Sequence, residues 1–163
     1  MVYSLKQIKF KFFDLLPILL LFFIALTGNS IIDLKIISIN IHYILVYYWV
    51  LRRPDTLGYG FIFLSGLISD VISGLPLGVN SLSLLVIAAV AAYARVVTVR
   101  VTLVNDLISF IPALLLSNLV YFLSLYFSNN SADYLYLFIT SVFTFIFYPI
   151  LWGFFTMVLN FSN

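Results

Sequence analysis

Six long apolar runs, joined by short connections, make up most of this chain and restrict what it can fold into. Several of them approach the roughly 20 residues that an α-helix needs to cross a bilayer. The runs are continuous and do not alternate with polar residues, which favours helices over a β-barrel. The expected helices are Phe12–Leu26, Ile36–Leu51, Thr56–Ile72, Leu77–Ala94, Leu107–Phe127 and Tyr134–Leu159. The sequence therefore predicts an all-α integral membrane bundle of about six transmembrane helices.

The composition supports a membrane protein and excludes several kinds of chemistry. The chain is 64% hydrophobic and 9% charged, whereas soluble domains carry about 25% charged residues. It has no cysteine, so disulfides, zinc–thiolate sites and thiol catalysis are excluded. No connection is long enough to hold another domain, so residues 1–163 are interpreted as a single polytopic transmembrane domain.

The distribution of basic residues predicts the orientation in the membrane. With six helices, one side receives Lys6, Lys9, Lys11, Arg52, Arg53, Arg95 and Arg100, and the other receives only Lys35. The positive-inside rule then predicts that both termini are cytoplasmic, with outer turns near Gly28–Lys35, Ser73–Pro76 and Ser128–Asp133. Tyr47, Tyr48 and Trp49 are expected at the inner interface. A secretory signal peptide at the basic start is the alternative, although Ala25–Thr27 is a poor cleavage site.

The connection between the second and third helices contains four charged or helix-breaking residues in a row, Arg52, Arg53, Pro54 and Asp55. Proline disfavours helix in the residue before it and suits the first turn of the next helix. Asp55 is therefore expected in the first turn of the third helix, near the positive end of its dipole. A charged interfacial turn and a docking site for a cytoplasmic partner are equally open interpretations.

The third helix has one small, polar face. A step of about 100° per residue places Gly58, Ser65, Gly66, Ser69, Asp70 and Ser73 within an arc of roughly 140°. Small faces let helix backbones approach closely, and serine hydroxyls can bond across the contact. We expect this face to point into the bundle or at a partner helix, and the third helix to be central.

Asp70 is an acid in an apolar run, and Gly74, Pro76, Gly78 and Asn80 follow it. Two glycines around a proline favour a tight, non-helical turn, whose free backbone groups need partners. We expect Asp70 to accept hydrogen bonds from this turn and so to hold the third and fourth helices in register. Contact with a ligand, an ion or a partner protein is the alternative.

Catalysis is not expected. There is one histidine, His42, and no glutamate, and the sequence lacks a nucleophile elbow and a glycine-rich phosphate loop. Asp70 and Asp106 are expected at opposite ends of their helices, too far apart for a catalytic pair. We also expect no metal, no cofactor and no nucleic-acid partner, because neither a ligand cluster nor a dense basic patch is present.

Two segments of the chain resemble a known family. YWVLRRPD (Tyr48–Asp55) and GLISDVISGLPLGVNSL (Gly66–Leu82), with Gly60–Phe61 between them, resemble the signature of MreD, the rod shape-determining membrane proteins. The likeness is close over about Tyr48–Ser83, and chain length and hydropathy agree over the rest. The residues singled out as a partner-interaction or structural motif are Arg52, Arg53, Pro54, Asp55, Gly66, Asp70, Gly74, Pro76, Gly78 and Asn80.

The resemblance implies a non-enzymatic, multi-pass component of the bacterial cytoplasmic (inner) membrane that belongs to the cell-elongation complex. It implies work with MreC, MreB, RodA and a class B penicillin-binding protein in a complex that directs lateral peptidoglycan synthesis. We expect MreC to be the direct partner, and the small face of the third helix and the turn Gly74–Asn80 to form the surface that contacts it. MreD is also similar to the substrate-binding S components of vitamin transporters. A transporter with an outer pocket near Asp70, Asn80 and Ser81 is therefore the alternative function.

Overall fold

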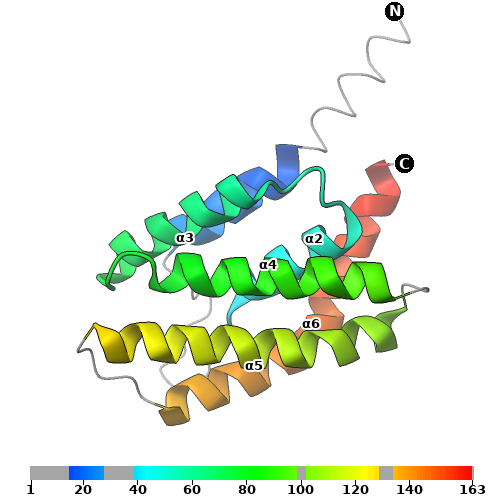
Figure 1. Ribbon diagram of the computed structural model, residues 1–163. Coiled ribbons are helices and arrows are strands. Elements are labelled where there is room, and N and C mark those ends of the chain that lie inside the picture. Colours follow the sequence, from blue (N-terminus) through cyan, green and yellow to red (C-terminus); the bar gives the residue numbers. More distant parts are fainter. Residues whose placement is uncertain (1–14, 28–38, 99–101, 129–133, 163) are drawn as a thin grey trace, which may run out of the picture.

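The computed structural model describes residues 15–27, 39–98, 102–128 and 134–162, and within them it has helices and no strand. The helices are Leu15–Leu26, α2 (Ile41–Arg52), α3 (Tyr59–Ser73), α4 (Val79–Val97), α5 (Leu103–Phe127) and α6 (Tyr134–Ser162) (Figure 1). The all-α prediction is confirmed for these residues. Lys6, Lys9, Lys11, Lys35, Arg100, the expected turn at 28–35 and residues 129–133 lie outside the described part of the chain.

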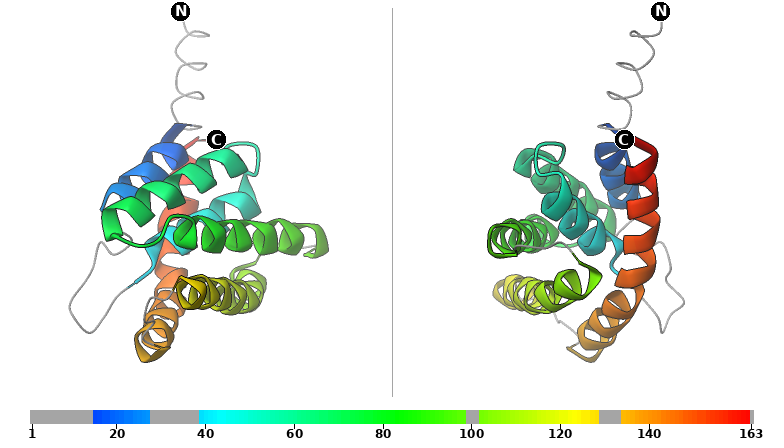
Figure 2. Two further views of the ribbon diagram at one scale, coloured as in Figure 1. Left: turned by 60° about the vertical axis from the view of Figure 1, so that its left-hand side comes forward. Right: turned by 90° about the vertical axis from the view of Figure 1, so that its right-hand side faces the viewer.

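Consecutive helices run in alternating directions. In Figure 1, α3 and α5 run from right to left, and α4 and α6 run from left to right. α4 packs against α2, α3 and α5, and α6 packs against α5 and α2. The start of the Leu15–Leu26 helix and the end of α6 lie at the same end of the bundle as the turn between α2 and α3 (Figures 1 and 2).

α2 is the buried centre of the bundle, so the expectation that the third helix is central was wrong. Every residue from His42 to Leu51 is buried, whereas α3 buries only one face. Tyr47 and Tyr48 are 0% exposed and Trp49 is 2% exposed, so these rings face the core of the bundle and not the surrounding lipid headgroups. Their rings contact Phe110, Tyr148 and Phe155 instead. Hydropathy cannot separate an aromatic residue in the core from one at an interface.

Three helices, α4, α5 and α6, are long and apolar enough to cross a membrane. Leu15–Leu26 and α3 are apolar but shorter. α2 has 12 residues, or about 18 Å of helix, against a hydrocarbon core of about 30 Å. The structure therefore supports three candidate spans among the described residues, rather than the six that the hydropathy predicts.

The ends of α2 and the start of α3 follow from three local features. Asn40 precedes α2, and its side chain accepts a hydrogen bond from the Tyr43 N–H at 3.2 Å, as expected of an N-cap. α2 ends at Arg52, as Pro54 predicts. α3, however, begins only at Tyr59, after the extended Gly58. Asp55 therefore lies in the connecting turn and not in the first turn of α3, which corrects that prediction.

Candidate functional site

The motif residues lie in two groups, one before α3 and one that runs from the middle of α3 to the start of α4. Arg52, Arg53, Pro54 and Asp55 form the turn between α2 and α3. Gly66, Asp70, Gly74, Pro76, Gly78 and Asn80 lie where α3 meets α4. The structure therefore does not bring the whole motif into one site, and the two groups make separate contacts.

Asp70 caps the start of α4 from a neighbouring helix. Its side chain is 0% exposed, its Oδ2 accepts a hydrogen bond from the Gly78 N–H, and its Oδ1 accepts one from the Asn80 N–H, both at 2.8 Å. A carboxylate at this position also faces the positive end of the α4 dipole. These contacts confirm the prediction that Asp70 accepts hydrogen bonds from the turn.

The turn that Asp70 closes depends on two glycines with positive φ. Gly74 ends α3 at φ 65°, where the Leu75 N–H donates to the Asp70 carbonyl at 2.9 Å. Gly78 precedes α4 at φ 104°. Residues with a Cβ rarely adopt these conformations. The glycines therefore let the chain reverse within a few residues, so that Asp70 reaches the N–H groups of the next helix.

Gly66 allows α3 and α4 to touch through their backbones. A Cβ added at Gly66 would lie 2.4 Å from the Ser81 Cα and 2.7 Å from the Ser81 N. The Ser81 hydroxyl donates a hydrogen bond back across this contact, to the Phe63 carbonyl at 3.2 Å. We expected the small face of the third helix to point either into the bundle or at a partner helix. At Gly66 it points into the bundle, because Ser81 occupies the place that a partner helix would need.

Replacing Asp70 with alanine is expected to lower the free energy of unfolding by about 2 kcal/mol, because two N–H groups lose their acceptor. Hydrogen exchange of the Gly78 and Asn80 amides should become faster. Ser69 provides the matched control, since its hydroxyl is buried and has no hydrogen-bond partner among the described residues. Ser69→Ala should therefore leave both quantities unchanged. Equal stability of the two variants would contradict the capping role.

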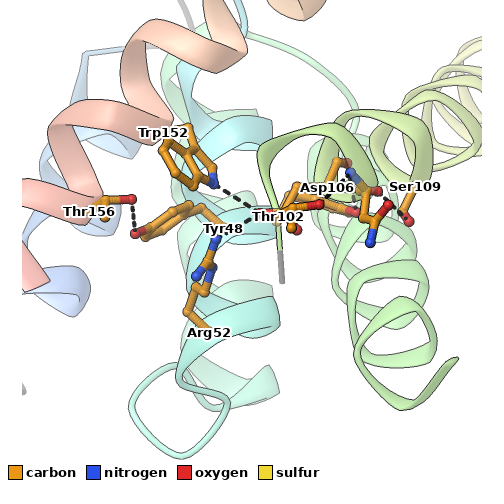
Figure 3. A network of polar contacts seen from close by, with 9 residues as sticks. Tyr48, Arg52, Thr102, Asp106, Ser109, Trp152 and Thr156 are labelled. Atoms are coloured by element: carbon orange, nitrogen blue, oxygen red, sulfur yellow. Dashed lines mark hydrogen bonds and ion pairs between the residues drawn. The ribbon is translucent and has the colours of Figure 1, made fainter. Parts of the chain in front are cut away.

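The second group of contacts centres on Asp106, at the start of α5. The Arg52 guanidinium donates to the Asp106 Oδ2 at 3.0 Å, and the Trp152 Nε1–H donates to the same oxygen at 2.9 Å (Figure 3). The Asp106 side chain is 1% exposed and that of Arg52 is 20% exposed. Three helices, α2, α5 and α6, are thus joined at one carboxylate.

Aromatic rings surround the arginine of this ion pair. The Arg52 guanidinium carbon lies 5.6 Å from the centre of the Tyr48 ring and 5.5 Å from that of Trp152 (Figure 3). The Tyr48 hydroxyl shares a hydrogen bond of 3.0 Å with Thr156. Each cation–π contact stabilises by about 0.5–2 kcal/mol. Together, these residues form the Asp106 cluster, which consists of Tyr48, Arg52, Asp106, Trp152 and Thr156.

The sequence interpretation missed the Asp106 cluster. It placed Arg52 in the same turn as Asp55, but Asp55 is exposed and Arg52 forms an ion pair with Asp106. One signal was available, because the end of the second helix and the start of the fifth were both assigned to the cytoplasmic side. An acid and a base at the same end of an apolar bundle are expected to pair.

His42 is a packed residue rather than an exposed base. It is 0% exposed, and its Nε2 lies 3.2 Å from the Ser65 hydroxyl, which itself donates to the Ile62 carbonyl. The serine therefore accepts from the histidine, which places the proton on Nε2. Within the described residues, no three His, Cys, Asp or Glu side chains lie close enough to hold a metal ion. Asp70 and Asp106 belong to separate clusters.

The contacts of Asp70 and Asp106 are those of a structural framework, in which buried polar groups join helices to one another. A comparison of the chain with protein-family models, with curated proteins and with solved structures gave no match.

Proposed function

We propose that this chain is a non-enzymatic, six-span component of the bacterial cell-elongation complex, similar to MreD, and that it supports MreC and lateral peptidoglycan synthesis. In this proposal both termini are cytoplasmic and the chain lies in the inner membrane. MreC is the direct partner, and MreB, RodA and a class B penicillin-binding protein are members of the same complex.

The observation that carries the proposal is the position of the residues that resemble MreD. Within Tyr48–Ser83, Asp70 caps α4, Gly66 lets α3 touch α4, and Arg52 binds Asp106. The signature residues thus join the helices of the bundle to one another. This is expected of a protein that acts by packing against other membrane helices.

The exposed surface also supports a role in packing against other membrane helices. α5 and α6 each expose one apolar stripe whose residues are three or four positions apart. The stripes consist of Val104, Ile108, Ile111, Leu115 and Leu119 on α5, and Leu135, Phe138, Val142, Ile146, Ile150, Phe154 and Met157 on α6. Such faces contact lipid or the apolar span of a partner.

The contacts of Asp70 favour the cell-shape proposal over the transporter alternative. A vitamin pocket would need polar groups directed at a ligand. Both Asp70 oxygens instead accept hydrogen bonds from the chain's own backbone, and the Ser81 hydroxyl donates to Phe63. A groove between the described residues lies at the other end of α3, beside the turn between α2 and α3.

Depletion of the protein in its rod-shaped bacterial host is expected to round the cells. The wild-type chain should restore the rods, and Asp70→Ala should restore fewer of them at matched membrane levels, because the scaffold is weaker. Microscopy measures cell shape, and co-purification measures binding of MreC. Cells that stay rod-shaped after depletion would contradict the proposal, and a new requirement for a vitamin would favour the transporter.

A further inference from the structure

A groove of about 630 Å³ opens beside the turn between α2 and α3. Its wall combines the last residue of α2, the turn itself, the first turns of α3, the last turn of α4 and the start of the Leu15–Leu26 helix. Three segments distant in sequence, within residues 15–18, 52–61 and at 95, thus form one concave surface at a single end of the bundle. Several helices begin or end beside the groove. It therefore lies where lipid headgroups would meet the apolar interior of a membrane.

The groove concentrates positive charge. Arg52, Arg53 and Arg95 line it, and Asp55 is the acid among its lining residues. Arg52 is paired with Asp106, which lies outside the lining. Among the described lining residues, arginines thus outnumber acids by three to one. A ligand with an anionic group would therefore complement this wall of the groove.

The other side of the groove is apolar. Leu15, Ile18 and Phe61 line it, and Leu15 and Phe61 remain 52% and 44% exposed. Apolar side chains next to a guanidinium pair do not suit a free phosphate or a nucleotide. They suit a molecule that carries an anionic group at one end and a hydrocarbon chain at the other.

We propose that this groove binds one anionic phospholipid. Its phosphate lies between Arg53 and Arg95, whose guanidinium groups present planar sets of N–H donors that match phosphate oxygens. Its acyl chain follows Leu15, Ile18 and Phe61 toward the hydrocarbon core. This site would fix the depth of the bundle in the membrane, and it stands whether or not the proposed cell-shape function holds.

The test uses the full chain purified in a mild detergent and titrated with phosphatidylglycerol or phosphatidylcholine, with bound lipid counted by native mass spectrometry. Arg95 is the residue to change, because it is exposed on the last turn of α4 and lies outside the Asp106 cluster. Arg95→Gln should weaken phosphatidylglycerol binding about fivefold, since one Lys or Arg near an anionic surface contributes about 1 kcal/mol. Arg95→Lys should restore most of the binding.

Lys35→Gln is the charge-matched control, because the charge distribution assigns Lys35 to the opposite side of the membrane. It should bind phosphatidylglycerol as the wild type does. The proposal is overturned if Arg95→Gln, shown to be folded by circular dichroism, binds as well as wild type, or if both lipids bind equally. Competition by water-soluble glycerophosphoglycerol as effective as that by the lipid would overturn it too, because it would assign the site to phosphate alone.

Discussion

Gly66→Ala is expected to lower the free energy of unfolding by about 3 kcal/mol, at the upper end of the range for overpacked sites. The new methyl group would lie 2.4 Å from the Ser81 Cα and 2.7 Å from the Ser81 N. These are backbone atoms, so no side-chain rotation relieves the contact and α3 must move away from α4. Unfolding in mixed micelles of increasing denaturing detergent measures the effect.

Gly60 is the matched control for this substitution, because it lies on the same helix and a Cβ there would have nothing within 4 Å. Gly60→Ala should be neutral or slightly stabilising, since alanine favours helix over glycine by about 1 kcal/mol. Ser81→Gly should fail to rescue Gly66→Ala, because it removes the hydroxyl but leaves the backbone in place. Equal stability of Gly66→Ala and Gly60→Ala would refute the close contact.

Asp106→Ala should also destabilise the protein by about 3 kcal/mol, because removing one partner of a buried ion pair leaves the other charge unpaired. The Arg52 side chain is 20% exposed, which lets some water reach it and places the loss at the low end of the usual range. The Trp152 N–H loses its acceptor in the same variant. Asp106→Asn should fall between alanine and wild type, since it keeps an oxygen but no charge.

A double variant distinguishes an unpaired charge from a general loss of packing. Arg52→Met with Asp106→Ala should be more stable than Asp106→Ala alone, because methionine keeps much of the apolar stem and removes the charge. Asp55→Ala is the control, as an exposed acid in the nearby turn, and should change stability by less than about 0.5 kcal/mol. A double variant less stable than Asp106→Ala would argue against the ion pair as the cause.

The sequence predicted the parts of this molecule that depend on neighbours in the chain. Gly74, Pro76 and Gly78 indicate a tight turn, and Asp70, four residues before it, is the nearest acid in the sequence to the freed N–H groups. The small face of the third helix likewise predicts the close contact at Gly66. Each inference needed only helix periodicity and the conformational limits of glycine and proline.

The parts that depend on the arrangement of whole helices were not predicted. Arg52 and Asp106 are 54 positions apart, and their pairing requires that α2 end where α5 begins. The burial of Trp49 and its neighbours depends on α2 being enclosed by other helices. In a chain that is apolar almost throughout, residues facing lipid and residues facing protein have the same composition, so hydropathy carries no signal about either.

The unequal lengths of the outer helices have a consequence for the surrounding bilayer. α3 has 15 residues, or about 22 Å of helix, and α6 has 29 residues, or about 43 Å. A hydrocarbon core of about 30 Å is too thick for the first and too thin for the second. In the proposed six-span arrangement, lipid beside α3 would have to thin, while α6 would tilt or extend into the headgroups. A bundle of that kind would impose a thickness gradient on its membrane, and neighbouring proteins with matching short spans would gather on its α3 side.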